Sequence, residues 1–192
     1  SKKVVGADNQ QESLETNGWI VGFTDGEGCF SVSLIRNKTT KAGWQVFPEF
    51  VITQGEKSLP ALKIFQKFFN CGNIFINKRY DNHNEYLYRY CVRSIKDLNE
   101  KIIPFFTRNH LCTAKLNDFK IFRRIVKMMN DKKHLSESGM RTIAKQIELI
   151  KAMVDKDPVK AMNARQAFAE FIGPVIQQVL KLSALSPLIY DD

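Results

Sequence analysis

The segment 19–28, which reads W-I-V-G-F-T-D-G-E-G, constrains this chain more than any other part of its sequence. It sets two glycines four residues apart, Gly22 and Gly26, and two acids two residues apart, Asp25 and Glu27. Glycine costs about 1 kcal/mol against alanine inside a helix. A helix that nevertheless carries two glycines near its end must need these positions to be free of side chains. Residues four apart share one helix face, which allows a second backbone to approach closely there.

Acids at the C-terminal end of a helix oppose its dipole, which indicates a functional role. If the approaching helix is a symmetry copy, two Glu27 carboxylates lie side by side and repel one another. Hard divalent cations such as Mg²⁺ relieve this repulsion, and two metals flanking a phosphate stabilise the attacking and leaving oxygens. Two simpler interpretations stay open. Asp25 can hydrogen-bond to backbone or cap a neighbour, and Glu27 can be a surface acid between turn glycines.

The remaining pattern predicts an antiparallel α+β fold. The expected elements, in order, are helix 12–26, strands 29–36 and 44–53, helix 58–70, strands 74–79 and 86–93, and helices 94–106, 113–129 and 136–154. Because the strands come as two hairpins, we expect a four-stranded antiparallel sheet with helices on one face. Pro48 indicates an edge strand or a bulge, and Ser58 and Ser136 are expected helix caps. We expect a core domain at 12–155 and a C-terminal helical extension at 156–192.

The basic charge favours a polyanionic partner. The chain has 29 Lys and Arg against 20 Asp and Glu, a net charge of +9. Nucleic acid or an acidic membrane face fits this excess, and a solvated basic surface is the alternative.

A twisted antiparallel ribbon fits the DNA major groove, where Arg reads guanine and Asn or Gln reads adenine. The side chains expected to contact DNA from the open sheet face are Ser31, Ser33, Ile35, Arg36, Asn37, Gln45, Ile76, Lys78, Arg89, Cys91 and Arg93. An ordinary solvated face is the alternative, and a slip of one residue would exchange the two faces of a strand.

Two other classes of protein are disfavoured. The four cysteines form no C-x-x-C pair and the three histidines form no ligand pair, so we expect reduced thiols and no zinc site. No apolar stretch approaches the roughly 20 residues of a membrane span, and no signal-peptide pattern follows the N-terminal Ser-Lys-Lys. We therefore expect an intracellular protein with no membrane partner.

The segment 20–28 resembles the LAGLIDADG motif of the homing endonucleases. The similarity continues to about Lys151 through G-C-F-S at 28–31, F-V-I-T-Q at 50–54, R-S-I-K-D-L at 93–98, I-P-F-F at 103–106, K-L-N-D-F at 115–119 and K-H-L-S-E-S-G at 133–139. The resemblance implies an αββαββα fold whose four strands form a saddle over double-stranded DNA. It also implies metal-dependent, site-specific cleavage of both strands that leaves a 5′-phosphate and a 3′-hydroxyl.

The resemblance assigns roles residue by residue. Glu27 matches the acid that binds the catalytic Mg²⁺, for which Mn²⁺ or another divalent cation can substitute, and Gly26 matches a position whose carbonyl adds to the coordination. Gln54 resembles the polar residue that helps to order metal-bound water. Lys115 resembles the basic residue near the scissile phosphate, and Asp25 resembles the structural acid of the motif.

A single copy of the motif implies a homodimer on a long pseudo-palindromic site. Its paired helices would be lined by Val21, Gly22, Asp25 and Gly26. Val21 stands where alanine is typical of the family, and its bulk would spread the helix pair slightly. Two alternatives stay open: a maturase that binds intron RNA, and a DNA-binding regulator that does not cut. The expected compartment is a mitochondrion or chloroplast, with the bacterial cytoplasm as the alternative.

Overall fold

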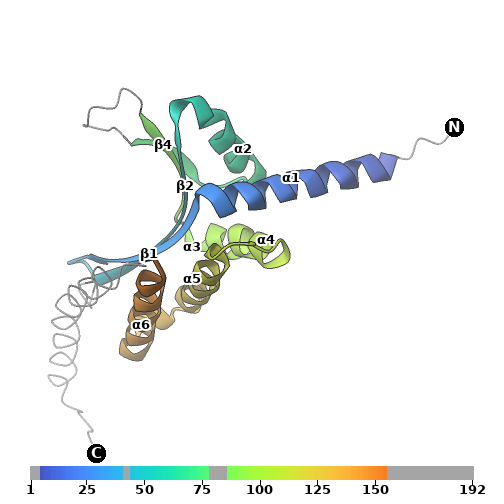
Figure 1. The fold of residues 1–192 in the computed structure, drawn as a ribbon. Coiled ribbons are helices and arrows are strands. Elements are labelled where there is room, and N and C mark those ends of the chain that lie inside the picture. The colour runs from blue at the N-terminus through green and yellow to red at the C-terminus, as the bar shows by residue number, and fades with distance from the viewer. Residues whose placement is uncertain (1–4, 41–43, 78–85, 155–192) are drawn as a thin grey trace, which may run out of the picture. The chain divides into compact units, whose positions relative to one another are not determined.

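The computed structural model describes residues 5–40, 44–77 and 86–154 of the 192 (Figure 1). Its elements are α1 Val5–Glu27, β1 Gly28–Arg36, β2 Trp44–Gly55, η1 Glu56–Ser58, α2 Leu59–Phe69, β3 Asn73–Asn77, β4 Leu87–Val92, α3 Ile95–Asp97, η2 Leu98–Ile102, α4 Ile103–Arg108, α5 Lys115–Asn130, η3 Lys133–Leu135 and α6 Glu137–Val154. Lys78 and the expected extension at 156–192 lie outside the described residues, so the boundary near 155 stays a prediction.

The four strands form one sheet in the order β1-β2-β4-β3. β4 pairs antiparallel with both β2 and β3, which confirms the antiparallel α+β expectation. Of the two interpretations of Pro48, the edge strand is wrong, because β2 lies between β1 and β4, and the bulge stays a prediction. Pro48 is tolerated there because it precedes the stretch from Phe50 to Gly55 that pairs with β4, so its missing amide leaves that ladder intact.

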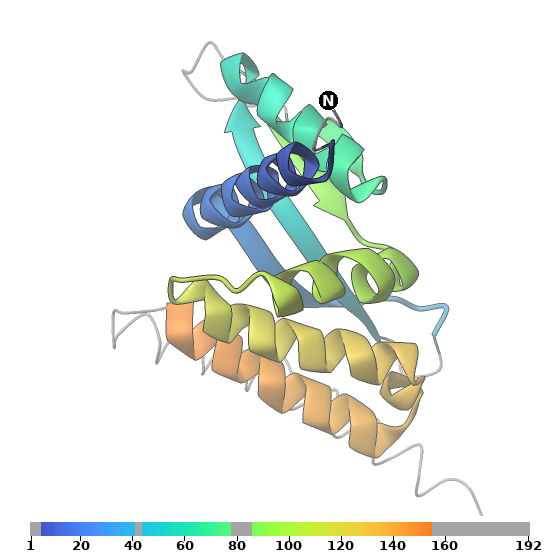
Figure 2. The same cartoon turned by 90° about the vertical axis from the view of Figure 1, so that its right-hand side faces the viewer.

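The described chain divides into two compact units. The first contains residues 5–32 and 47–131, and the second contains residues 33–40, 44–46 and 132–154. Within the first unit, α1, α2, α4 and α5 lie on one face of the sheet, which leaves the other face of that part of the sheet uncovered by helices (Figures 1 and 2). The expected arrangement of helices on one face is therefore confirmed for this unit.

Aromatic rings fill the space between the sheet and the helices of the first unit. The Phe30 ring lies at 5.0 Å from Phe50, 5.4 Å from Phe106, 5.2 Å from Phe119 and 5.4 Å from Phe122, measured between centroids. These rings come from β1, β2, α4 and α5, so one cluster joins both layers. Large buried rings contribute strongly to core stability, and this cluster fixes the sheet against the helices that flank α1.

The helices differ in detail from the expected ones. α1 begins at Val5 rather than near residue 12, and Leu14 within it is 66% exposed. Ser58 precedes α2 but makes no capping hydrogen bond with its side chain. In the second unit, Ser136 Oγ does accept a hydrogen bond from the Gly139 amide, at 3.2 Å, as a cap should.

The described residues include all four cysteines and the helices α1 to α6. Cys29, Cys71, Cys91 and Cys112 are all free thiols. Within the described ranges no helix has the length and apolar character needed to cross a bilayer.

Candidate functional site

The C-terminal end of α1 is bound by a lysine from a distant part of the chain. Lys115, at the start of α5, donates from Nζ to the carbonyl oxygens of Asp25 at 2.7 Å and Gly26 at 2.8 Å. The last carbonyls of a helix have no partner within it, and the helix dipole favours a cation at this end. The structure therefore brings Lys115 to the peptide units that immediately precede Glu27.

The Asp25 side chain holds the loop that leads to Lys115. Its carboxylate accepts hydrogen bonds from the Cys112 amide at 2.7 Å, the Thr113 amide at 3.2 Å and Thr113 Oγ1 at 2.6 Å. Burial raises the pKa of Asp25, but the bonds from Thr113 and Cys112 and the charge of Lys115 outweigh it and lower the pKa overall. The simpler interpretation of Asp25, a short acid bonded to backbone, is confirmed by these contacts.

The glycines around Glu27 fall into two kinds. A Cβ on Gly28 would lie 2.6 Å from Thr24 Cγ2 and 2.8 Å from the Thr24 carbonyl oxygen, so the direct passage from α1 into β1 requires glycine there. A Cβ on Gly22 or Gly26 would meet no described atom within 4 Å. Packing within the described chain therefore does not explain why these two positions lack side chains.

The oxygen atoms at the end of α1 are suited to a hard cation. Two backbone carbonyls already converge on the Lys115 ammonium, and the exposed Glu27 adds a carboxylate beside them. Mg²⁺ usually takes one or two carboxylates and fills its octahedron with water and substrate phosphate oxygens. The described residues contain no group of three or more His, Cys, Asp or Glu side chains that could hold a metal by themselves. A cation at this helix end would therefore need ligands beyond the Glu27 carboxylate and the backbone carbonyls.

Gln54 is the other residue expected to take part in catalysis. It stands near the C-terminal end of β2, opposite Tyr88 of β4, and is half-buried. Among the described residues no hydrogen bond joins its side chain to Glu27 or to Lys115, so its expected role in ordering water stays a prediction.

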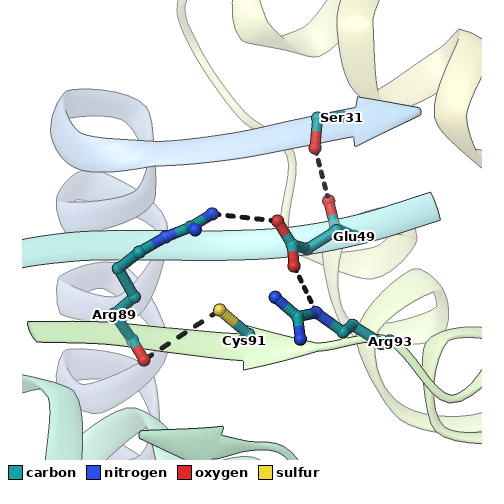
Figure 3. Close-up of polar contacts among 5 residues, drawn as sticks. All are labelled: Ser31, Glu49, Arg89, Cys91 and Arg93. Atoms are coloured by element: carbon teal, nitrogen blue, oxygen red, sulfur yellow. Dashed lines mark hydrogen bonds and ion pairs between the residues drawn. The ribbon is translucent and has the colours of Figure 1, made fainter. Parts of the chain in front are cut away.

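The open face of the sheet carries a buried carboxylate between two arginines (Figure 3). Glu49 Oε1 accepts from Arg89 Nη2 at 3.0 Å, and Glu49 Oε2 accepts from Arg93 Nε. The Arg93 guanidinium also lies 5.3 Å from the ring centroids of both Phe47 and Phe75. The alternation of β2 and β4 predicts Arg89 and Arg93 on this face. The alternation of β2 also places Phe47 and Glu49 on this face, although neither is among the expected DNA-contacting residues. Phe75 was missed, because cross-strand register is needed to find it.

Strand register and burial each correct one of the expected DNA-contacting positions. Phe75 lies opposite Arg89 and Ile76 lies opposite Tyr88, and directly opposed residues share a face. The expectation that Ile76 lies on the face of Arg89 is therefore wrong by one residue, and Phe75 takes that place. Cys91 is on the expected side but is 3% exposed, so its side chain offers almost no surface to a partner.

The β1 positions keep the expected alternation. Cys29, Ser33 and Ile35 are exposed while Phe30 and Val32 are buried. Ser31 Oγ donates to the Glu49 carbonyl oxygen at 3.4 Å (Figure 3).

In the second unit, polar and basic side chains of the two strand ends contact one another. Asn37 Nδ2 donates to Gln45 Oε1 at 2.9 Å, and the Arg36 guanidinium lies 5.4 Å from the Trp44 ring centroid. The expected DNA-contacting residues Asn37 and Gln45 thus contact one another, whereas Arg36 contacts the Trp44 ring.

The chain combines an αββαββ core with an acid at the end of its first helix and two arginines on the open face of its sheet, and comparison with known proteins gives its family. The model of the LAGLIDADG endonucleases matches residues 20–126, more than half of the 192 residues. The chain belongs to the LAGLIDADG endonuclease family. The family expectation drawn from segment 20–28 is thus confirmed.

Similar proteins with a name or a solved structure agree with this assignment. The chain is 35% identical over 125 residues to "Probable intron-encoded endonuclease 2" of Neurospora crassa, covering 65% of this chain and 27% of that protein. The homing endonuclease I-TnaI has a TM-score of 0.63 and 35% identity, over 79% of this chain and 97% of that one. The LAGLIDADG homing endonuclease I-LtrWI, solved bound to its target DNA, has a TM-score of 0.64 and 32% identity, over 69% and 43%. The chain spans about a quarter of the length of two Neurospora crassa relatives, 27% and 24%.

Proposed function

We propose that this chain is a site-specific DNA endonuclease of the homing type. It would cut both strands of duplex DNA with the help of a divalent cation and leave a 5′-phosphate and a 3′-hydroxyl. The observation that carries the proposal is the pair of bonds from Lys115 Nζ to the carbonyls of Asp25 and Gly26, at 2.7 and 2.8 Å, directly before Glu27. Relatives named as endonucleases, and a neighbour solved bound to target DNA, support it.

Each residue at the end of α1 has a distinct part in this proposal. The Glu27 carboxylate and the Gly26 carbonyl would hold Mg²⁺, which when bound lowers the pKa of a water nucleophile and stabilises charge on phosphate oxygens. Lys115 places a positive charge where negative charge develops on the scissile phosphate. Asp25 keeps that lysine in place through the 112–113 loop. Gln54 is proposed to orient water from the end of β2.

We also propose that two copies act together. One chain offers one exposed carboxylate at the end of α1, and an isologous dimer would bring a second Glu27 beside the first. The open positions at Gly22 and Gly26 support this, since a partner helix can approach there without meeting a side chain. Val21 would border the contact, and Asp25 would support it by fixing the helix end.

The proposed partner is double-stranded DNA, read by the open sheet face. Relatives named for fungal introns, such as the "Uncharacterized 50.9 kDa protein in ND4 intron 1" of Podospora anserina, support a mitochondrial location. Chloroplast and bacterial locations stay as alternatives. Binding of intron RNA as a maturase, and DNA binding without cleavage, are the alternatives that the experiment below separates.

A plasmid cleavage assay tests the proposal. Supercoiled plasmid carrying the sequence that flanks this gene, joined without the gene, is incubated with protein in Mg²⁺ or in EDTA. We expect linear product in Mg²⁺ alone. Glu27→Gln should abolish cleavage and leave binding of the same duplex in place, because it removes a metal ligand without altering the sheet. Glu15→Gln, a change on an exposed part of α1, is the matched control and should cut normally.

Three results would contradict the proposal. Cleavage by Glu27→Gln at the wild-type rate would exclude the metal-binding role of this acid. Equal cleavage in EDTA would exclude the divalent cation. A strictly monomeric protein on its duplex, measured by sedimentation, would exclude the dimer.

A further inference from the structure

The carboxylate of Glu49 is placed in the middle of a surface proposed to face polyanionic DNA. Its side chain is 10% exposed, whereas the Arg89 and Arg93 side chains bound to it are 35% and 42% exposed. A buried acid at this position opposes the attraction of phosphates, so charge attraction does not explain it. It does bind one guanidinium with each of its two oxygens (Figure 3).

The Arg93 guanidinium is held in a defined orientation, with the edge formed by its two terminal nitrogens available to a partner. Its Nε is used by Glu49, and its guanidinium lies 5.3 Å from the centroids of two rings, Phe47 and Phe75. Among the described residues its two terminal nitrogens have no hydrogen-bond acceptor. Two parallel terminal N–H groups are the arrangement that binds the O6 and N7 atoms of guanine.

Arg89 approaches the same carboxylate from further along β4. It lies opposite Thr53 in the register, four residues before Arg93. Because both guanidinium groups bond oxygens of one carboxylate, they lie next to one another although their backbones are about 13 Å apart at 3.3 Å per residue. Two positive groups held this closely would repel each other without the negative charge of Glu49 between them.

We propose that Glu49 is a positioning residue that fixes Arg89 and Arg93 to read guanines at neighbouring base pairs of the target, with the rings of Phe47 and Phe75 holding the Arg93 fork. This inference rests on the proposed site-specific DNA binding and deepens it. Because both arginine side chains are already ordered in the free protein, binding costs them less conformational entropy. Base recognition is then selective, because a guanidinium held in one orientation cannot turn to a nearby phosphate. The negative charge of Glu49 also lowers the affinity for DNA of any sequence.

The test is a selection from a randomised duplex library, with Ca²⁺ in place of Mg²⁺, using wild-type protein and three variants. Arg89→Lys and Arg93→Lys keep the charge beside Glu49 and remove the fork. Because the proposed dimer presents each arginine twice, each variant should lose a G·C preference at one position in each half-site, by about 5- to 150-fold, with the rest of the consensus unchanged. Within one half-site, the positions lost by the two variants should be adjacent or separated by one base pair.

Glu49→Gln distinguishes a positioning role of this carboxylate from a purely structural one. We expect it to weaken both G·C preferences at once while binding to non-specific duplex becomes tighter, since a negative charge is removed from the face. Thermal melting monitors folding, and the two lysine variants carry the test if this variant does not fold. Arg141→Lys, on an exposed α6 residue paired with Glu137, is the control and should keep the whole consensus.

Four results would overturn the inference. Lysine variants that keep both G·C preferences would exclude base reading by these arginines. Equal loss of affinity for every sequence would assign the arginines to phosphates instead. G·C preferences many base pairs apart within one half-site would exclude a shared carboxylate as their support. A wild-type protein that selects no consensus would refute the proposed site-specific function together with the inference, whereas the first three results leave that function standing.

Discussion

Replacing Asp25 by asparagine tests how the chain holds the end of α1. The carboxylate accepts three hydrogen bonds, from the amides of Cys112 and Thr113 and from Thr113 Oγ1. Hydrogen bonds to a charged group contribute about 1.5–3 kcal/mol each when shielded and less when exposed, as here. Asparagine keeps one acceptor and turns an NH₂ group toward the other donors. We expect Asp25→Asn to lower the free energy of unfolding by about 1–3 kcal/mol at neutral pH.

The lowered pKa of Asp25 also predicts how the stability difference between wild type and Asp25→Asn changes with pH. Hydrogen bonds and Lys115 lower the pKa of Asp25 in the folded chain despite the opposing effect of burial. The stability that the charged group contributes is therefore complete above the unfolded-state pKa of about 3.9 and is lost as the pH falls through the lower folded-state value. Asp25→Asn should remove this part of the acid dependence. The difference in stability between wild type and variant should shrink as the pH falls below about 4.

Urea denaturation at pH 7 and at several acid pH values measures both effects, and plasmid cleavage measures the consequence for activity. Because the 112–113 loop leads directly to Lys115, loosening it should slow cleavage about 10- to 100-fold even though Glu27 is intact. Thr113→Val is the matched control. It removes one of the three bonds to Asp25 and the longer bond, 3.3 Å, from the Lys115 amide to Thr113 Oγ1, so its loss of stability should be smaller. Equal stability of Asp25→Asn and wild type, with the same pH dependence, would refute the reasoning.

Three further substitutions test the packing of the first unit by denaturation. Gly72→Ala should destabilise by about 2–4 kcal/mol, because Gly72 has φ of 77° and an added Cβ would lie 2.8 Å from the Cys91 carbonyl oxygen; retained stability would contradict this. Thr24→Val should stabilise by about 1 kcal/mol, since Thr24 is fully buried and its hydroxyl has no partner among the described residues; a loss of stability would show that the hydroxyl is satisfied. Tyr90→Phe should destabilise by about 1 kcal/mol by removing the 3.0 Å bond from its hydroxyl to the Cys71 carbonyl, and an unchanged midpoint would count against that bond.

Local patterns predict the elements of this chain better than their arrangement. The alternation in β1 correctly separates buried Phe30 and Val32 from exposed Cys29 and Ser33. The position of β2 could not be predicted from Pro48, since proline excludes only a ladder bond at its own amide. The neighbour of β2 is decided by the whole sheet, and β4 pairs beyond Pro48. Similarly, Leu14 matches a helical period but lies on a stretch of α1 that packs against little of its own chain.

At the end of α1, the local sequence predicts some of the site residues, and only the family resemblance predicts the others. The glycine and acid spacing predicts a special helix end at Asp25 and Glu27 from ten residues of sequence. No local pattern joins this end to Lys115, since contacts across some ninety residues depend on how α5 packs. The resemblance to the family supplies that residue, and the hydrogen bonds of Lys115 Nζ supply a physical reason for it. The unpaired carbonyls at the C-terminal end of a helix accept hydrogen bonds, and the helix dipole favours a positively charged donor there.

The open sheet face depends on register, which alternation within one strand does not give. Arg89 and Arg93 follow from the period of β4 alone, but Ile76 was placed with them by assuming the wrong phase for β3. Glu49 shows that the net charge of a sequence likewise does not give the distribution of charge on one face. A net charge of +9 describes the chain, whereas one carboxylate placed between two arginines decides how that charge is presented to DNA. A face that only attracted phosphates would gain from losing Glu49, so tighter but less selective binding by Glu49→Gln is the expected sign that this acid serves recognition.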